Sequence, residues 1–336
     1  MLKQYVEPYE TISIIGISKN AGKTTVLNKI IEEYKGKAIG ITSIGLDGEK
    51  TDNITNKPKP RIKVYPKMLV ATASECLNEA TCNYVVHEKT NVRTQLGNIM
   101  IVEVITPGLM LVAGPSTNHE MVEVTHRLRR YNIKKVFIDG ALFRKSIASF
   151  RVADACILAT GASFDDDMNK VVLETKKTVD QLNLEVVVPM HKIKIIKYHK
   201  HMTITVQGRI RVIKNENLLG NEECIEEYLN PKVRVLYING ALTNKLVNHI
   251  VNKWNVIEDL TVVVNDPSHI LLNKASIHRL EMMKVKIKVL NKTNLLFVTY
   301  NPVSPNGTVF DNEEFGRELS QTIEMPIFNV VNNMEW

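Results

Sequence analysis

Short apolar runs alternate with amphipathic stretches through the first 190 residues of the chain. Residues 12–17 form a β-branched apolar run, and residues 26–31 place four apolar side chains at helical spacing. Further apolar runs of strand length occupy residues 37–45, 98–105, 134–141, 154–160 and 184–190. Strands that alternate with helices in this way are typical of βαβ units, so the pattern predicts an α/β fold with a mostly parallel sheet.

Two of the predicted helices carry start signals. In residues 114–128, Thr117 and Glu120 have the spacing of a capping box. Residues 164–182 open with three aspartates, which are favourable near the positive end of the helix dipole. We therefore expect a helix in each segment, with the aspartates in the first turn of the second one.

A basic segment follows the regular alternation. Residues 191–214 contain no acidic residue, and we expect an irregular or hairpin connector whose lysines guard an exposed edge strand. A docking surface for an acidic partner is the alternative. Residues 215–336 then repeat the order of strand and helix. The sequence thus predicts a first domain over residues 1–190, a connector over 191–214 and a smaller α/β lobe over 215–336, which we expect to dock a partner.

One pentapeptide occurs twice with a single difference. Residues 138–142 read IDGAL and residues 238–242 read INGAL, 100 positions later. Both segments lie at the end of a predicted strand. The match is either a remnant of internal duplication or a coincidence between two strand ends.

Composition places the chain among ordinary globular proteins. Its 336 residues are 44% hydrophobic and 24% charged, which suits about two domains, each with its own core. The uncharged apolar stretches are well short of the roughly 18–20 residues that a membrane helix needs. The first ten residues lack the apolar core of a secretion signal. We expect a cytoplasmic protein without a membrane partner.

The charge balance and the cysteines narrow the class of ligand. The chain has 43 basic and 36 acidic residues, a net charge of +7. This surplus suits a phosphorylated ligand but is small for a protein that wraps nucleic acid, and no nucleic-acid-binding motif is present. The four cysteines form no C-x2-C pair, so we expect buried thiols rather than a zinc or redox site.

The strongest chemical signal is residues 16–25, GISKNAGKTT, between the first predicted strand and the first predicted helix. Small residues let successive backbone N–H groups point into one concavity, and a helix N-terminus adds partial positive charge. In such a loop Lys23 would act on the β- and γ-phosphates and Thr24 would be a Mg²⁺ ligand. We therefore expect ATP (or GTP) and Mg²⁺ here, with Lys23 as a catalytic residue. The expected nucleotide-binding residues are Asn20, Ala21, Gly22, Lys23, Thr24 and Thr25.

The spacing of this loop departs from its common form. Five residues separate Gly16 from Gly22, one more than usual. This spacing resembles the dethiobiotin-synthetase branch of P-loop proteins, in which VFIDGA and ILATGASFDDDMN also have counterparts. The resemblance implies a P-loop NTPase-type sheet flanked by helices. It also implies that Asp139 is a catalytic carboxylate that binds Mg²⁺ or orients water; an aspartate that caps a turn is the alternative.

Further candidates follow other predicted strands. Asp47, Glu49 and Asp52 come after the second strand, and we expect Asp47 to be a Mg²⁺ ligand, with a plain Asp-Gly turn as the alternative. Residues 159–163, ATGAS, either line the nucleotide site or form a glycine turn into a helix.

Two pairs of basic side chains have simpler explanations. Arg144 and Lys145 reach phosphates or a partner, or are solvated. His199 and His201 alternate on a possible strand, as two metal ligands would. No third ligand is spaced for that site and neighbouring lysines oppose a bound cation, so we expect no metal there.

Several blocks together resemble a narrower family. They read GISKNAGKTTVLN, GITSIGLDGEKTD, VAGPSTN, VFIDGALFRKSIAS, ILATGAS and TYNPVSPNGTVFD, and they extend from residue 16 to residue 311. They resemble the ATP-binding subunit of the lysine 5,6-aminomutase reactivase. The resemblance implies an ATPase that acts with a larger reactivase ATPase subunit. Together they would exchange damaged cobalamin for adenosylcobalamin in an inactivated adenosylcobalamin-dependent aminomutase.

Two other classes of protein use the same loop. One is an ATP-dependent carboxylate–amine ligase or kinase of the dethiobiotin-synthetase type, with its substrate in the second lobe. The other is a nucleotide-gated binding module without turnover of its own. The sequence contains no cobalamin-ligating Asp-x-His-x-x-Gly motif, which suits a reactivase that does not carry the cofactor. It also presents no Ser-His-Asp, Cys-His or paired-carboxylate constellation.

Overall fold

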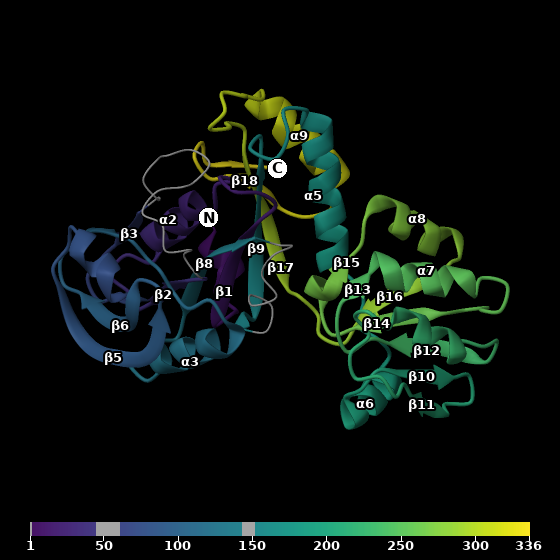
Figure 1. The fold of residues 1–336 in the computed structure, drawn as a ribbon. Helices are drawn as coiled ribbons and strands as arrows, with labels where there is room; N and C mark the ends of the chain where they lie inside the picture. Colours follow the sequence, from purple (N-terminus) through teal and green to yellow (C-terminus); the bar gives the residue numbers. More distant parts are fainter. Residues whose placement is uncertain (1, 45–60, 143–151) are drawn as a thin grey trace. The chain divides into compact units, whose positions relative to one another are not determined.

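The computed structural model describes residues 2–44, 61–142 and 152–336 (Figure 1). Contacts divide the chain into two units: unit 1 comprises Met1–Val179 and Asn294–Trp336, and unit 2 comprises Asp180–Thr293. Unit 1 is an α/β structure with a large, mixed, mostly parallel sheet that is flanked by helices. The predicted α/β class is confirmed.

The centre of the unit 1 sheet is β1 (Thr11–Gly16), the apolar run before the glycine loop. It pairs in parallel with β8 (Val136–Leu142) on one side and with β9 (Ala155–Gly161) on the other. β2 (Gly40–Ser43) lies parallel beside β8, and β17 (Leu295–Asn301) lies parallel beside β9. These five strands therefore end at the same edge of the sheet, where ligands bind in open α/β sheets.

Antiparallel strands complete this sheet at both sides. β4 (Leu69–Ala73) is parallel to β2, and β6 (Gly97–Val104) and β5 (Tyr84–Thr94) add an antiparallel hairpin. On the other side β18 (Ile327–Asn329) is parallel to β17, and β19 (Met334–Glu335) is antiparallel to β18. The strand order is β19-β18-β17-β9-β1-β8-β2-β4-β6-β5. The run predicted at residues 98–105 is thus a strand, in the antiparallel part of the sheet.

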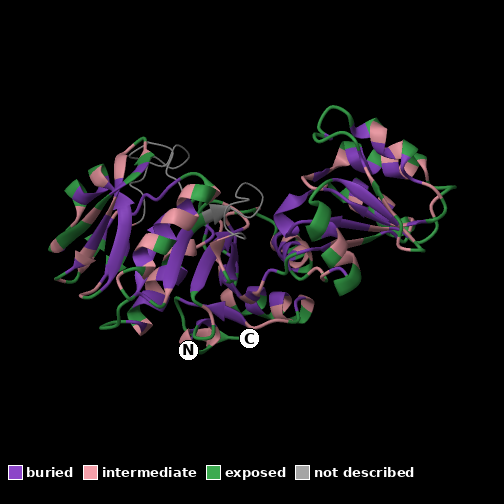
Figure 2. Cartoon of the chain, turned by 90° about the horizontal axis from the view of Figure 1, so that it is seen from below, coloured by how far each residue is buried: buried purple, intermediate pink, exposed green. Residues whose placement is uncertain are grey.

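Alternate residues of β8 face opposite sides of the sheet, as the two-residue period of a strand requires. Phe137 packs in a buried cluster with α2 (Lys23–Glu33), whereas Val136 and Ile138 pack in another cluster with α3 (Asn118–Arg129). The two helices therefore cover opposite faces, and the strands between them are buried (Figure 2).

The helix starts match the predictions in one case and differ in the other. α3 begins at the predicted capping box, where the Thr117 side chain accepts a hydrogen bond from the Glu120 amide. α5 (Met168–Leu182) begins after the three aspartates, because Asp167 caps its start by accepting a hydrogen bond from the Asn169 amide. Asp165 accepts a hydrogen bond from the Asp167 amide in the turn before it. The remaining elements of unit 1 are α1 (Lys3–Val6), β3 (Ile62–Val64), a 3₁₀ helix (Ser74–Glu79), β7 (Gly108–Met110) and α9 (Asn312–Thr322).

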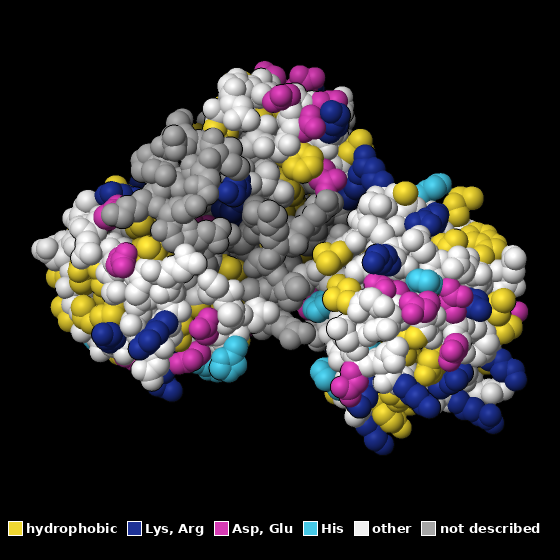
Figure 3. Space-filling view, in the orientation of Figure 1, with side chains coloured by type: hydrophobic (Ala, Val, Ile, Leu, Met, Phe, Trp, Pro, Cys, Tyr) yellow, Lys and Arg dark blue, Asp and Glu magenta, His cyan; other side chains and the backbone are white. Residues whose placement is uncertain are grey.

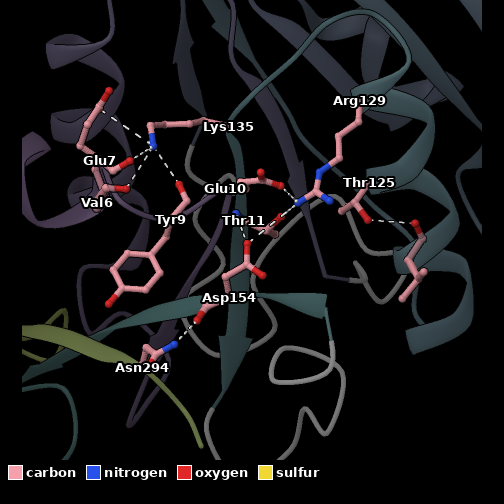
Figure 4. Close-up of polar contacts among 11 residues, drawn as sticks. Val6, Glu7, Tyr9, Glu10, Thr11, Thr125, Arg129, Lys135, Asp154 and Asn294 are labelled. Carbon is pink, nitrogen blue, oxygen red and sulfur yellow. Dashed lines mark hydrogen bonds and ion pairs between the residues drawn. The ribbon is translucent and has the colours of Figure 1, made fainter.

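The amino ends of the central strands are joined by a polar cluster (Figure 4). The Lys135 ammonium donates to three backbone carbonyls of residues 6–9, at 2.6 to 3.2 Å. The Thr11 amide donates to Asp154 at 2.8 Å, and Arg129 donates to the Thr11 hydroxyl at 2.7 Å. These bonds hold the amino ends of the central strands together.

Unit 2 is built on a five-stranded sheet in the order β11-β10-β12-β14-β16. Its strands are β10 (Met202–Thr205), β11 (Ile210–Val212), β12 (Val233–Tyr237), β14 (Thr261–Val264) and β16 (Lys286–Val289), of which the last three are parallel. α7 (Asn244–Asn252) and α8 (Lys274–Met282) pack in one buried cluster, and α6 (Pro189–Tyr198) packs in another. The small elements are a 3₁₀ helix (Glu222–Glu227), β13 (Leu242–Thr243), a 3₁₀ turn (Pro267–His269) and β15 (Ile270–Leu271).

The two units correct the expected domain boundaries. We expected residues 215–336 to form one lobe, but residues 294–336 belong to unit 1 because β17 pairs with β9. The alternation of strands and helices continues without a break from unit 2 into β17, so the pattern alone does not reveal the return. The first unit also ends at residue 179 rather than 190.

The basic segment 191–214 is part of unit 2 and not an irregular connector. Pro189 starts α6, because proline is well suited to the first turn of a helix. The strand expected at residues 184–190 is reduced to a single bridge between Val186 and Val289. The expected hairpin is present as β10 and β11. Within the described ranges no helix combines the length and the apolar character needed to cross a membrane.

Candidate functional site

The glycine loop joins the end of β1 to the start of α2. The Ile17 amide still donates to the Ala159 carbonyl of β9 at 3.1 Å, and the chain then leaves the sheet. Asn20 and Gly22 have left-handed φ values of 60° and 97°, which turn the backbone back toward the helix. Gly22 is the N-cap and provides no capping side chain, while the first amides of a helix have no intrahelical acceptor. The loop therefore presents amide donors at the positive end of α2.

The Lys23 side chain folds back across this loop. Its ammonium donates to the Ser18 carbonyl at 3.0 Å. A Cβ atom on Gly16 would lie 2.8 Å from the same nitrogen, so the lysine can take this path only past a glycine. Burial lowers the pKa of Lys23, and the nearby Asp139 carboxylate opposes that shift. A cationic group is thus held inside the curve of the loop.

Thr24 and Asp139 form the most informative contact. The Thr24 hydroxyl donates to Asp139 Oδ2 at 2.9 Å, linking the first turn of α2 to β8. Asp139 is only 7% exposed, and its Oδ1 has no hydrogen-bond partner among the described residues. Burial raises the pKa of Asp139, and the bond from Thr24 and the charge of Lys23 act in the opposite direction. A buried carboxylate oxygen without a partner is costly unless a ligand satisfies it.

The oxygen atoms of Thr24 and Asp139 suit a small, hard cation. Mg²⁺ prefers oxygen ligands and is usually held by one or two protein groups together with phosphate oxygens. The Thr24 hydroxyl and Asp139 Oδ1, which has no partner among the described residues, are oxygen groups of this kind near the amino end of α2. Sequence analysis named both residues, and the structure brings them together from positions 115 residues apart.

The segment at residues 159–163 lies against the loop, on the other side of β1. The Ser18 and Ser163 hydroxyls are 2.9 Å apart, and the Ala162 amide donates to the Asn301 carbonyl at 3.0 Å. A Cβ on Gly161 would lie 2.4 Å from that carbonyl, so β9 and β17 can approach this closely only because residue 161 is glycine. The carboxyl ends of β1, β9 and β17 therefore form one surface.

A small, shallow pocket adjoins this surface. It lies beside the amino end of α2 and the end of β17, and it is lined by Ala21, Gly22, Thr25, Val26, Thr299, Tyr300, Asn301, Val330 and Val331. Sequence reasoning missed its β17 side. The signal available was the polar pair Tyr300-Asn301 before a proline at a strand end, but only the pairing of β17 with β9 places it here.

Other predicted residues do not join the site. Asp47, Glu49 and Asp52 lie outside the described residues, as do Arg144 and Lys145. His199 ends α6 and does not share a strand with His201. No cluster of three His, Cys, Asp or Glu side chains able to hold a metal occurs in the ranges 2–44, 61–142 and 152–336.

The cysteines match their expected role for the most part. All four are free thiols; Cys76, Cys82 and Cys156 are buried, and Cys224 is partly exposed.

Comparisons with known proteins add no assignment to this geometry. No protein-family model matches the chain, no curated protein matches it, and no solved structure matches it. The functional argument therefore rests on the residues of the site.

Proposed function

We propose that this protein binds a Mg²⁺–nucleoside triphosphate at residues 16–25 and hydrolyses it. The observation that carries the proposal is the contact between Thr24 and Asp139. Asp139 Oδ2 accepts a hydrogen bond from the Thr24 hydroxyl, and the buried Oδ1 has no partner among the described residues. A lysine lies beside this pair, and the amide donors of a helix start surround it. Cation ligands, a phosphate-binding lysine and free amides are the three components that phosphoryl transfer requires.

Each component has a separate role. The amides of the loop and of the first turn of α2 bind the phosphate oxygens, and the Lys23 ammonium exchanges the Ser18 carbonyl for a phosphate oxygen. Thr24 and Asp139 hold the cation. Mg²⁺, when bound, neutralises negative charge on the β- and γ-phosphates. The pocket that Tyr300 and Asn301 line is next to the loop, and we expect the nucleoside to lie toward it.

A finer assignment rests on the sequence blocks alone. Their resemblance supports a subunit of the lysine 5,6-aminomutase reactivase, in which nucleotide turnover drives the exchange of damaged cobalamin. Such a subunit can open a mutase only if its two nucleotide states bind the mutase with different free energies. A ligase or kinase of the dethiobiotin-synthetase type would have the same phosphate site, so the assignment depends on the second reactant.

Calorimetric titration with Mg-ATP tests the nucleotide site. Lys23→Ala is expected to lose affinity by about a hundredfold, because a buried cation that contacts phosphate is removed. Lys29→Ala, also on α2, is the matched control and should bind as the wild type does. Equal affinities of wild type and Lys23→Ala would contradict the proposal.

A reactivation assay tests the finer assignment. Lysine 5,6-aminomutase is blocked with hydroxocobalamin and then mixed with this protein, the larger reactivase subunit, Mg-ATP and adenosylcobalamin. We expect turnover to return only with ATP and with Lys23 intact. If protein that binds Mg-ATP restores nothing, the reactivase assignment fails while the nucleotide site stands.

A further inference from the structure

The positive charge of this chain is concentrated in one stretch. Residues 186–215 contain seven lysines and arginines and no aspartate or glutamate, while the net charge of the whole chain is +7. The rest of the sequence is therefore neutral overall. A surplus confined to 30 residues acts at one surface rather than through the field of the whole molecule.

The same stretch exposes large aliphatic side chains. Met190, Ile193 and Ile196 of α6 are 61%, 69% and 57% exposed, while Ile195 on the opposite side of the helix is buried. The Lys194 ammonium donates to the Gly208 carbonyl at 2.9 Å, which holds α6 against the turn of the β10–β11 hairpin. That turn exposes Val206. We call the exposed side chains of residues 186–215 the basic face.

The cations of the basic face are mostly without anionic partners. Among the described residues, only Lys200 forms an ion pair, with Glu216 at 3.1 Å. Lys192, Lys197, Arg209 and Lys214 have no ion pair there. In the space-filling view, lysines and arginines gather around apolar side chains over α6 and β11 (Figure 3). Exposed aliphatic groups ringed by unpaired cations are typical of an interaction surface.

Unit 1 has a surface of the opposite sign. Residues 161–170 and 303–324 together carry eight carboxylates and two cations. The two segments contact each other, since the Thr308 hydroxyl donates to Asp166 and the Ala162 amide donates to the Asn301 carbonyl next to the second segment. Acidic side chains gather over α9 in the same view (Figure 3).

This second surface also has an apolar centre. Phe164, Val303 and Val309 are 38%, 50% and 67% exposed, and the last two face each other across a β-bridge. We call the exposed side chains of residues 161–170 and 303–324 the acidic face.

We propose that the basic face of one copy of this protein binds the acidic face of a second copy. The contact is heterologous, since two different surfaces of the same chain meet. The two faces match in charge, and each has exposed apolar side chains at its centre that the contact would bury. Other occupants of the basic face explain less. Neither a nucleic acid nor a lipid surface gives a reason for an acidic, apolar counterpart on the same chain.

Sedimentation velocity from about 1 µM to about 100 µM protein tests the association. At about 0.05 M salt the mass is expected to rise with concentration above the 38.1 kDa of one chain. At about 0.5 M salt it should fall toward one chain, because salt screens exposed charges. Lys23→Ala should associate as the wild type does, since Lys23 belongs to neither face.

Two single variants make the test specific. Ile193→Asp and Val309→Asp alter exposed positions on the basic and acidic faces, and each should weaken association about tenfold or more. An equimolar mixture of the two should regain a heterodimer, because each variant contributes one intact face. Met282→Asp, 64% exposed on α8, is the matched control and should associate normally.

Three outcomes would overturn the proposal: wild type that stays monomeric at every concentration, variants that associate as the wild type does, or a mixture that does not complement. Monomeric protein that co-sediments with vesicles containing about 30% phosphatidylserine, and loses this with Ile193→Asp, would assign the basic face to a lipid surface instead.

Discussion

The two units differ in how the polar side chains near the carboxyl ends of their parallel strands are hydrogen-bonded. In unit 1, β8 passes through Asp139, whose Oδ1 lacks a partner among the described residues. In unit 2, β12 leads into Asn239, and both atoms of its side-chain amide are hydrogen-bonded. Nδ2 donates to the His199 carbonyl at 3.0 Å, and Oδ1 accepts from Asn265 Nδ2 at 3.2 Å. Asp139 keeps an oxygen atom available, whereas the polar groups around Asn239 bond one another.

The hydrogen-bond network around Asn239 extends over three neighbouring strands of unit 2. The buried Tyr237 hydroxyl donates to Asn265 Oδ1 at 2.7 Å. His201 lies just before β10. Its Nδ1 accepts a hydrogen bond from the backbone amide of Asn239 at 3.0 Å, and its Nε2 is 3.2 Å from the Glu216 carbonyl oxygen. All of these side chains have partners within unit 2, so the network stabilises the unit.

The contrast falls on the one position at which the repeated pentapeptide differs. IDGAL has Asp139 where INGAL has Asn239. The backbones differ as well, because Gly140 has a left-handed φ of 96° and Gly240 does not. A satisfied asparagine contributes to stability, whereas the Asp139 oxygen without a partner among the described residues supports the cation site proposed above. The pentapeptide match is therefore no guide to function.

Exchanging the two residue types should break this contrast, with the largest effect in unit 2. Asn239→Asp replaces the donor to the His199 carbonyl with an oxygen, so we expect unit 2 to lose about 1–3 kcal/mol. Asp139→Asn retains an acceptor for Thr24 and removes a buried charge, so unit 1 should lose little or nothing.

Tryptophan fluorescence in urea can follow the two units separately. The chain has two tryptophans, Trp254 in unit 2 and Trp336 in unit 1, so Trp336→Phe and Trp254→Phe backgrounds report one unit each. Equal losses in both units would remove the distinction between Asp139 and Asn239.

A smaller loss is expected from Tyr237→Phe. The variant removes the buried hydroxyl that donates a hydrogen bond to Asn265 Oδ1. We expect the free energy of unfolding of unit 2 to fall by about 1 kcal/mol. Tyr198→Phe, at an exposed position on α6, is the control and should change nothing measurable. A Tyr237→Phe protein as stable as the wild type would mean that the network adds no stability.

The mildest effect should come from pH. Burial lowers the pKa of His201, and its bond to the Glu216 carbonyl opposes the shift. The unfolded chain protonates this residue near its ordinary pKa of about 6.5, while the folded unit resists protonation until lower pH. The free energy of unfolding of unit 2 should therefore fall as the pH is lowered through about 6.5.

The variant His201→Gln isolates this contribution, because His191 also has a pKa lowered by burial. Urea unfolding at about pH 7.5 and about pH 5.5 should show a smaller pH effect in the variant than in the wild type. An unchanged pH profile would assign the effect to other groups.

The parts of the site that follow one another in the chain could be predicted from the sequence. Strand, glycine loop, Lys23, Thr24 and helix are consecutive, so local pattern and spacing were sufficient. Asp139 was named only through the resemblance of VFIDGA to the dethiobiotin-synthetase branch, because local pattern does not place it beside the loop. Ser163 beside Ser18, and Asn301 beside the loop, depend on strand order, which local hydrophobic pattern does not encode.

The fold was predictable to the same extent. The α/β class and most strands follow from local periodicity. The return of residues 294–336 to unit 1 does not, because β17 has the same apolar pattern whether it joins the sheet of unit 2 or pairs with β9. α6 was missed because its exposed isoleucines and methionine interrupt the usual polar face of a helix.

The most direct test of the Asp139 site in unit 1 is the effect of Mg²⁺ on ATP affinity. Calorimetric titrations of wild type and Asp139→Asn are compared with Mg²⁺ and with a chelator. Our account predicts that Mg²⁺ tightens ATP binding to the wild type by about tenfold or more and has little effect on the variant. A Mg²⁺ effect of equal size in both proteins, or no ATP binding by the wild type, would contradict it.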